Sequence, residues 1–159
     1  MHKLLPLFII IFLFIHGCTF PEPTQTVTQA DVPNTDAIII VEDIPEQKEY
    51  FTLNRATITD TQLAVTLGFN YACENVIVRA YSTAGQGFME SAPAQTNVYL
   101  VYETPDEACD AALSRGTFSF DLTPLIELYA QSYQRNDPLI LNVIPHDNTQ
   151  ETISVLYTP

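Results

Sequence analysis

The sequence predicts an all-β fold, an antiparallel, immunoglobulin-like sandwich of two sheets with one short crossover helix. Apolar and polar residues alternate with a period of two in several segments, turn-forming residues separate these segments, and one segment has helical spacing instead. The 159 residues give room for one such domain with appendages, and not for two domains. A small barrel is the alternative arrangement of the same strands.

The expected strands follow one another between turn residues. A β-branched run at 38–41 predicts the first strand, and an acidic break follows it. Residues 51–59 alternate loosely, and residues 63–71 alternate without interruption after a turn at Asp60 and Thr61. Enrichment in Val, Ile, Tyr and Phe predicts strands at 75–81, 97–103 and 117–121. Residues 139–144 and 152–157 are expected to form a terminal hairpin, because Pro, Asp and Asn within 145–149 are typical of a turn.

The helix is expected after the strand at 117–121. Thr123 can N-cap it with Pro124 at the first helical position. Apolar and small residues then recur at intervals of three to four, at Leu125, Leu128, Tyr129 and Ser132. Residues 135–138, with the sequence RNDP, are expected to end the helix.

The N-terminus has the pattern of an export signal. After the basic Lys3, residues 4–15 form an apolar run broken only by Pro6, which suits a signal peptide and is shorter than the roughly 20 residues of a membrane-spanning helix. The next residues, Ile15-His16-Gly17-Cys18, resemble the lipobox of bacterial lipoproteins. The resemblance implies cleavage before Cys18 and acylation of its thiol, so that the lipid bilayer holds the protein through acylated Cys18.

The residue after the cysteine, Thr19, resembles the pattern of sorting to the outer membrane, so we expect a lipid-anchored protein of the bacterial cell envelope, at the outer membrane. The alternative is an ordinary secretory signal or an uncleaved anchor, with Cys18 an incidental thiol. The expected organisation is a signal peptide at 1–17, a lipidated N-terminus and flexible linker at 18–36, and the β-sandwich domain at 37–159. The linker is rich in Thr, Pro and Gln and could extend roughly 50 Å from the bilayer.

The charge of the chain restricts its partners. Six basic residues against 19 acidic ones give a formal net charge of −13, and the sequence pI is near 4.2. Binding to nucleic acid needs clustered Lys and Arg, so no nucleic-acid partner is expected. An envelope protein or a glycan remains as a partner, and no cofactor is expected, because the chain has no Gly-rich phosphate loop.

The three cysteines fit an oxidising compartment. With Cys18 assigned to lipid, Cys73 and Cys109 remain as a pair. A bond between them would stabilise the fold by roughly 3.8 kcal/mol on the chain-entropy model. The alternative is two buried free thiols, which would suit a reducing cytosol.

The body of the chain also resembles a family of small exported bacterial proteins, often lipoproteins. The resemblance rests on a cysteine-bearing strand, a Phe-Met-Glu-Ser loop, a second cysteine and a Phe-Asp-Leu-x-Pro-Leu segment. Here they stand at residues 70–74, 88–91, 108–111 and 120–125. The resemblance implies export and the disulfide, and it implies no chemistry.

Candidate catalytic and metal-binding residues are few. His146, the single histidine after the predicted cleavage site, lies in a predicted turn without a nucleophile motif, so we interpret it as a solvated residue. A zinc site would lack ligands once the two cysteines are oxidised. The densest carboxylate cluster comprises Glu103, Asp106, Glu107 and Asp110. It could support a hydrolase acting on carbohydrate, or a calcium site, and a solvated rim is the simpler interpretation.

One loop is a candidate binding surface. Residues 82–95 place two large apolar side chains, Phe88 and Met89, among Gly and Pro residues. They could form a partner-binding tip, or the loop could fold back to cap the open end of the core. The sequence as a whole therefore predicts a non-enzymatic binding or structural module, with no catalytic residues and no metal site.

Overall fold

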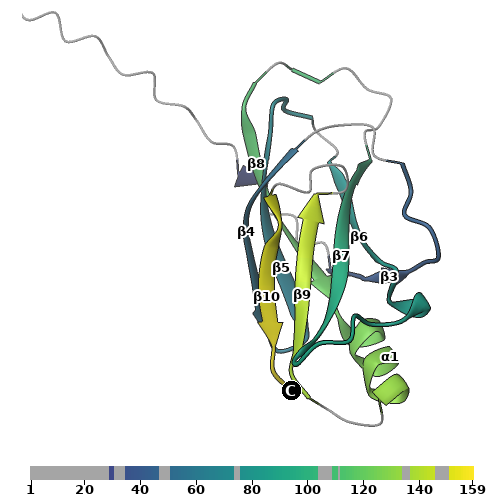
Figure 1. The fold of residues 1–159 in the computed structure, drawn as a ribbon. Coiled ribbons are helices and arrows are strands. Elements are labelled where there is room, and N and C mark those ends of the chain that lie inside the picture. Colours follow the sequence, from purple (N-terminus) through teal and green to yellow (C-terminus); the bar gives the residue numbers. More distant parts are fainter. Residues whose placement is uncertain are drawn as a thin grey trace, which may run out of the picture.

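The computed structural model describes residues 29–30, 35–46, 51–73, 76–103, 109–110, 112–133, 137–145 and 151–159. Within them, two β-sheets face each other, and a helix lies at one end of the sandwich (Figure 1). The predicted two-sheet sandwich with one helix is confirmed, and the described strands do not close into one barrel.

Each sheet has five strands. The first contains β1 (Gln29–Ala30), β2 (Thr35–Ala37), β4 (Phe51–Thr59), β5 (Gln62–Phe69) and β8 (Ser114–Asp121), in the order β1-β8-β5-β4 with β2 also paired to β8. The second contains β3 (Ile39–Ile40), β6 (Ile77–Ser82), β7 (Ala94–Glu103), β9 (Leu139–Pro145) and β10 (Ile153–Tyr157), in the order β10-β9-β7-β6-β3.

The sheets are mixed, which corrects the prediction of a purely antiparallel sandwich. Four of the eight pairings between described strands are antiparallel, and β7 with β9, β1 and β2 with β8, and β3 with β6 are parallel. The central parallel pair has a simple cause. The chain leaves β7, runs back along the molecule in β8 of the other sheet, and crosses through α1 (Thr123–Tyr133) into β9. Strand β9 therefore starts at the same end as β7 and runs in the same direction (Figure 1).

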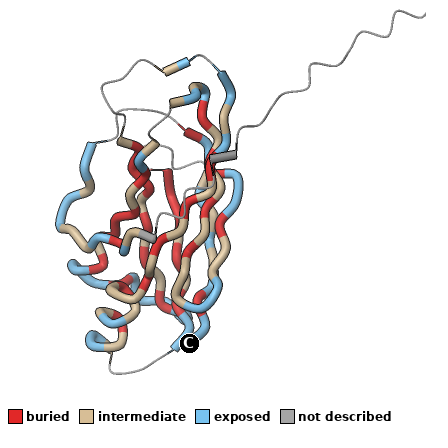
Figure 2. Tube along the Cα trace, turned by 180° about the vertical axis from the view of Figure 1, so that it is seen from behind, coloured by how far each residue is buried: buried red, intermediate tan, exposed pale blue. Residues whose placement is uncertain are grey.

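The core lies between the sheets, where alternate residues of each strand are buried. In β5, Leu63, Val65, Leu67 and Phe69 are buried and the residues between them are half-buried, as the period of two predicts. Facing them from β7 are Ala94, Thr96, Val98, Leu100 and Tyr102. The alternation of buried and partly exposed residues along the strands is visible in Figure 2. Each fully buried Leu or Phe stabilises the fold by about 1.5–3 kcal/mol.

Strand β7 begins at Ala94, three residues earlier than the sequence predicted. Its first outward residues, Gln95 and Asn97, are polar, and Gln95 was expected in the loop before the strand. In the structure they join a network of side-chain amides on the outer face of the second sheet. The Asn142 amide donates to Gln95 Oε1 at 3.2 Å, and Asn97 donates to the Tyr99 hydroxyl at 2.9 Å. Polar residues can therefore belong to a strand when their neighbours across the sheet are also polar.

Part of the predicted linker belongs to the sandwich. Gln29–Ala30 and Thr35–Ala37 pair with β8, so the predicted boundary of the body at residue 37 lies too far along the chain. Their polar composition indicated an unpaired segment. An edge strand, however, gains backbone hydrogen bonds from its neighbour without burying apolar side chains of its own. The remaining residues of 18–36 lie outside the described part of the chain.

The helix is capped by Asp121 rather than by the predicted Thr123. The Asp121 carboxylate accepts hydrogen bonds from the Thr123 backbone N–H at 3.0 Å and from its hydroxyl at 2.7 Å. Thr123 itself is the first helical residue, and its hydroxyl is a donor in this contact. The sequence pattern was misjudged because both residues are good capping residues, and the end of β8 places the carboxylate in reach of the helix.

The terminal hairpin is confirmed by the antiparallel pairing of β9 with β10, in which Val143 lies opposite Ile153. Pro145 lies in β9, and the rest of the predicted turn, residues 146–150, lies outside the described residues.

Candidate functional site

The loop before β7 is held in a defined shape. After a short 3-10 turn at Ala84–Gln86, Gly87 has a φ of 120°, a conformation that glycine adopts without the strain other residues would have. The backbone of Met89 then pairs with that of Gln95 through hydrogen bonds of 2.8 and 3.3 Å. These two bonds close a small loop of residues 90–94, which we call the rim loop.

The rim loop stands beside a cluster of three aromatic rings. The Phe88 ring centroid lies 5.0 Å from that of Tyr129 and 5.8 Å from that of Tyr133, and the two tyrosine centroids are 5.2 Å apart. Tyr129 and Tyr133 are four residues apart on α1, so they share one face of the helix. Phe88, which precedes the rim loop, is thereby packed against the last turns of α1.

The two residues predicted as a binding tip have different environments. Phe88 is 7% exposed and belongs to the core, whereas Met89 is 45% exposed. The location of Phe88 matches the capping alternative that the sequence left open. Partner binding stays a prediction, and it concerns Met89 and the residues around it.

An open hollow separates the rim loop from the helix. Its larger part has a volume of about 490 Å³ and is lined by Glu90, Ser91, Ala92, Ala94 and Tyr133. A smaller part of about 210 Å³ is lined by the same loop, by Tyr129, and by Asp137 and Pro138. The two parts share Ser91, Ala92 and Ala94, so we treat them as one site, the end hollow.

Tyr129, which lines the smaller part of the end hollow, has a buried polar atom. Tyr129 is 1% exposed, and its hydroxyl oxygen has no hydrogen-bond partner among the described residues. Burying a hydroxyl without a hydrogen-bond partner is unfavourable, so this atom is a candidate for contact with a ligand. The helical spacing predicted Tyr129 as one of the regularly spaced residues of the helix and did not include Tyr133, although two tyrosines four residues apart were a usable signal.

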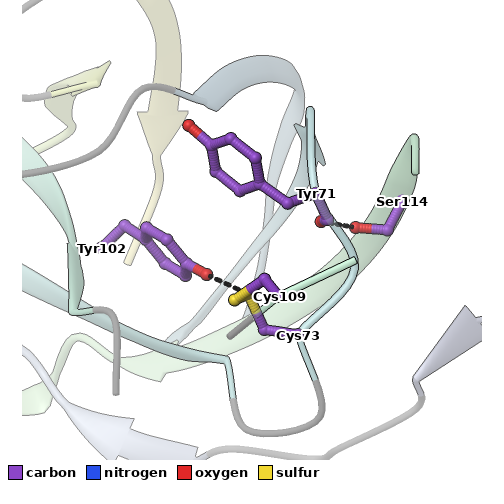
Figure 3. Close-up of a disulfide and its surroundings, with 5 residues drawn as sticks. All are labelled: Tyr71, Cys73, Tyr102, Cys109 and Ser114. Carbon is purple, nitrogen blue, oxygen red and sulfur yellow. Dashed lines mark hydrogen bonds between the residues drawn. A yellow bond between two sulfur atoms is a disulfide. The ribbon is translucent and has the colours of Figure 1, made fainter. Parts of the chain in front are cut away.

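The disulfide lies at the other end of the sandwich. Cys73 and Cys109 are bonded, as predicted, and the Tyr102 hydroxyl donates to the Cys73 sulfur at 3.3 Å (Figure 3). Beside the bond, Ala72 and Asp110 pair through two backbone hydrogen bonds of 2.9 and 3.0 Å. The Ser114 hydroxyl donates to the Tyr71 carbonyl at 2.7 Å. Since Ser114 begins β8 and α1 follows its last residue, the strand's length separates the disulfide from the end hollow.

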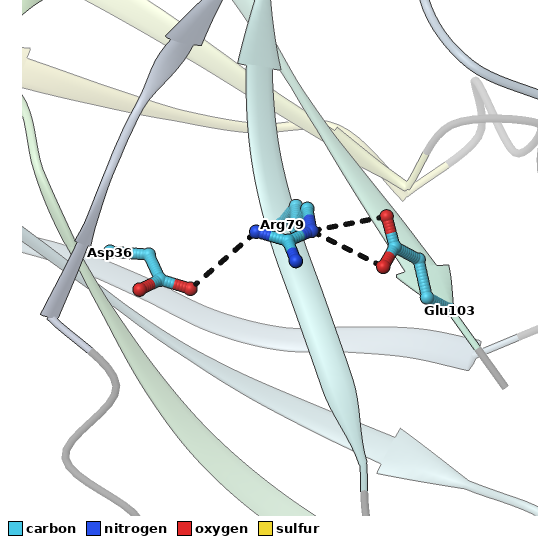
Figure 4. A network of polar contacts seen from close by, with 3 residues as sticks. All are labelled: Asp36, Arg79 and Glu103. Carbon is cyan, nitrogen blue, oxygen red and sulfur yellow. Dashed lines mark hydrogen bonds and ion pairs between the residues drawn. The ribbon is translucent and has the colours of Figure 1, made fainter. Parts of the chain in front are cut away.

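A charged contact joins the two sheets at one edge. The Arg79 Nε lies 3.1 and 3.2 Å from the two carboxylate oxygens of Glu103, and Arg79 Nη1 lies 3.9 Å from the Asp36 carboxylate (Figure 4). The hydrogen bond to Glu103 and its negative charge raise the pKa of Arg79, and burial first and then Glu103 raise the pKa of Tyr81. Asp36 of β2 is thus linked to β6 and β7.

The predicted carboxylate cluster is only partly described. Glu103 is paired with Arg79, and the exposed Asp110 lies beside the disulfide. Asp106, Glu107, His146 and Cys18 lie outside the described residues. Among the residues that the structure describes, no three His, Cys, Asp or Glu side chains gather as a metal site would require. In the same part of the chain, no helix has the length and apolar character needed to cross a bilayer.

Comparison with known proteins identifies the fold. No protein-family model matches the chain, and no curated protein matches it. The structure of a NigD-like immunity protein from Bacteroides caccae ATCC 43185 is similar with a TM-score of 0.55 at 10% identity, over 79% of this chain and 65% of that protein. A protein from Parabacteroides distasonis ATCC 8503, proposed to be toxin-related, gives 0.50 at 12% identity, over 78% and 61%.

A third structure, of a protein from Bacteroides fragilis NCTC 9343 proposed to be a lipoprotein, gives a TM-score of 0.48 at 9% identity, over 79% of this chain and 68% of that one. This chain spans less than two thirds of the length of the first two proteins. At 10 and 12% identity, these two similarities establish a shared β-sandwich fold and nothing about activity.

Proposed function

We propose that this protein is an exported, lipid-anchored module of the bacterial cell envelope that binds a partner and catalyses no reaction. The observation that carries the proposal is the end hollow, a shaped site with aromatic side chains at the end of the sandwich opposite the disulfide. Rigid sandwiches commonly present recognition sites on the loops at one end.

The position of the N-terminal strands supports an orientation in which the end hollow faces away from the membrane. Gln29 pairs with Arg115 at the start of β8, near the disulfide, so the described chain begins at that end of the first sheet (Figure 1). A lipid on Cys18 would attach the protein through the residues that precede Gln29. The end hollow would then face away from the bilayer, where a partner can reach it.

The lipobox-like residues 15–18 and the disulfide support the cellular location. A disulfide persists in an oxidising compartment outside the cytosol. Thr19 favours the outer membrane as the site of anchoring. One protein of the same fold is described as an immunity protein, a role that a non-enzymatic module could fill.

Intact mass spectrometry of the protein from the membrane fraction tests the anchor. We expect the mass of a chain that starts at Cys18 and carries acyl groups. Reduction of the disulfide should add the mass of two hydrogens. The matched Cys18→Ser variant should lose the acyl mass and leave the membrane fraction. An unacylated wild-type protein that still carries residues 1–17 would contradict the proposal.

Photo-crosslinking in the native host tests the binding role. A photoreactive residue at Met89, beside the end hollow, should give a discrete crosslinked product. The same residue at Leu113, which is 72% exposed and lies near the disulfide, is the matched control and should not give that product. Identical crosslinks from both positions would argue against a site at the end hollow.

A further inference from the structure

We infer that the end hollow binds a cationic side chain, the guanidinium or ammonium group of an Arg or Lys in a basic polypeptide partner. This inference rests on the proposed binding function and specifies the chemistry of the partner.

The first argument is the unpartnered hydroxyl of Tyr129. It is buried, it has no hydrogen-bond partner among the described residues, and Tyr129 lines the smaller part of the hollow. A phenol hydroxyl accepts a hydrogen bond as well as donating one, and guanidinium and ammonium groups are pure donors that use its acceptor side. A cation in the hollow would therefore supply the hydrogen bond that no residue in the described part of the chain supplies.

The second argument is the aromatic composition of the site. Tyr133 is partly exposed and lines the larger part of the hollow, and the buried rings of Phe88 and Tyr129 pack against it. A cation within about 6 Å of an aromatic ring centroid is attracted by the negative face of the ring, and Arg also stacks on such faces.

The third argument is charge. Glu90 lines the larger part of the hollow, so a carboxylate stands beside the aromatic side chains. The protein as a whole carries a formal charge of −13, which favours the approach of a basic partner and disfavours an acidic one. The hollow is open and its two parts adjoin, which suits a side chain projecting from a polypeptide.

The test is an NMR titration of the full chain in non-ionic detergent with N-acetyl-L-arginine methylamide. The citrulline analogue has nearly the same shape without the charge and serves as the matched ligand control. We expect saturable shifts at residues 90–94 and in the last turn of α1 with the arginine derivative, and none with citrulline. Equal binding of both ligands, or shifts confined to other acidic surfaces, would overturn the inference.

Variants separate the site from general electrostatic attraction. Tyr129→Phe removes one hydroxyl and should weaken binding about tenfold, the effect expected for losing a hydrogen bond to a charged group. Glu90→Gln should weaken binding and Asp110→Asn should not, although both remove one negative charge. Equal losses for the two charge variants would mean that the net charge, and no specific site, attracts the ligand.

The stability of Tyr129→Phe provides an independent readout. Because the hydroxyl has no partner among the described residues, its removal should leave the melting temperature unchanged or raise it. A clear decrease would show that the hydroxyl already stabilises the fold, and the inference would fail.

If the arginine derivative does not bind while crosslinking at Met89 succeeds, the binding function stands and the cationic class of ligand is wrong. Binding of a neutral chito-oligosaccharide in its place would assign the site to a glycan.

Discussion

Phe88 and Met89 are neighbours in the chain with opposite environments. Phe88 points into the aromatic cluster with Tyr129 and Tyr133, and Met89, which precedes the rim loop, is half exposed. The backbone pairing of Met89 with Gln95 explains the difference, because consecutive side chains of an extended segment point in opposite directions. One residue therefore holds the loop in place and the other is available to a partner.

The two residues should respond differently to truncation. Phe88→Ala removes a buried ring and should destabilise the fold by about 3–5 kcal/mol, whereas Met89→Ala should change stability by less than about 1 kcal/mol. Urea denaturation of both variants measures the difference, and Met89→Ala is the control for the loop backbone. Equal losses of stability would contradict the capping role of Phe88.

The helix α1 depends on one side chain outside it. Asp121 ends β8, and its carboxylate accepts two hydrogen bonds from Thr123, so the same residue finishes a strand and caps the helix. The Asp121 carbonyl also accepts a hydrogen bond from the Ile38 N–H at 2.9 Å, where the chain passes from β2 to β3. The crossover helix and the N-terminal strands are thus anchored at one point.

Capping by Asp121 predicts a pH dependence. The hydrogen bonds from the Thr123 side chain and backbone lower the pKa of Asp121 below its ordinary value of 3.8. The carboxylate therefore stabilises the fold fully above the unfolded-state pKa, and this contribution disappears as the pH falls through the lower folded-state pKa. Asp121→Ala should cost about 0.5–2 kcal/mol at pH 7.

Denaturation of the wild type and of Asp121→Ala at pH 7 and below pH 3 is the measurement. The difference between the two proteins should shrink in acid. Asp121→Asn keeps an acceptor oxygen without the charge, so it should lose less stability and show little dependence on pH. A difference that stays constant from neutral to acid would disprove a contribution from the charged carboxylate.

The sandwich as a whole has two unlike ends. One end holds the disulfide, the bridge between Ala72 and Asp110, and the first described residues of the chain. The other holds the aromatic cluster and the end hollow. A covalent bond fixes the end nearer the proposed anchor, and side-chain packing shapes the end proposed to bind.

Loss of the disulfide should weaken the whole domain. The bond joins residues separated by 36 positions, and its removal in Cys73→Ala/Cys109→Ala should cost roughly 2–5 kcal/mol. The comparison is best made with Cys18→Ser in both proteins, so that no third thiol takes part. Reductant should lower the denaturation midpoint of the protein that retains Cys73 and Cys109 and leave the double variant unchanged. Equal midpoints for the two proteins without reductant would refute a stabilising role.

Much of the fold could be predicted from local patterns. The alternation in residues 63–69 marks a strand buried on one face, and the spacing around Leu125 and Tyr129 marks the helix, because each pattern reflects the geometry of a single element. The pairing of Cys73 with Cys109 followed from counting thiols in a chain predicted to be exported. The strands at 29–30 and 35–37 could not be predicted, because their pairing with β8 depends on a neighbour that lies far along the chain.

The candidate site was found only in part. Phe88 and Met89 were visible as apolar residues in a loop, and nothing in their neighbourhood indicated that Tyr129 and Tyr133 would face them. The contact of Arg79 with Asp36 and Glu103 was equally hidden, since it joins three strands of two sheets. Side chains that meet across a sandwich leave no periodic pattern, because no backbone repeat relates them.

Short-range physics was enough to predict a β-sandwich with one helix and a stapling disulfide, since strand alternation, helix spacing and thiol pairing each appear within the amino-acid order. The parallel placement of β7 beside β9, the burial of Phe88 and the unpartnered hydroxyl of Tyr129 emerged from the folded chain alone. They depend on which distant segments pack together, and that choice minimises the free energy of the whole molecule rather than of any one segment.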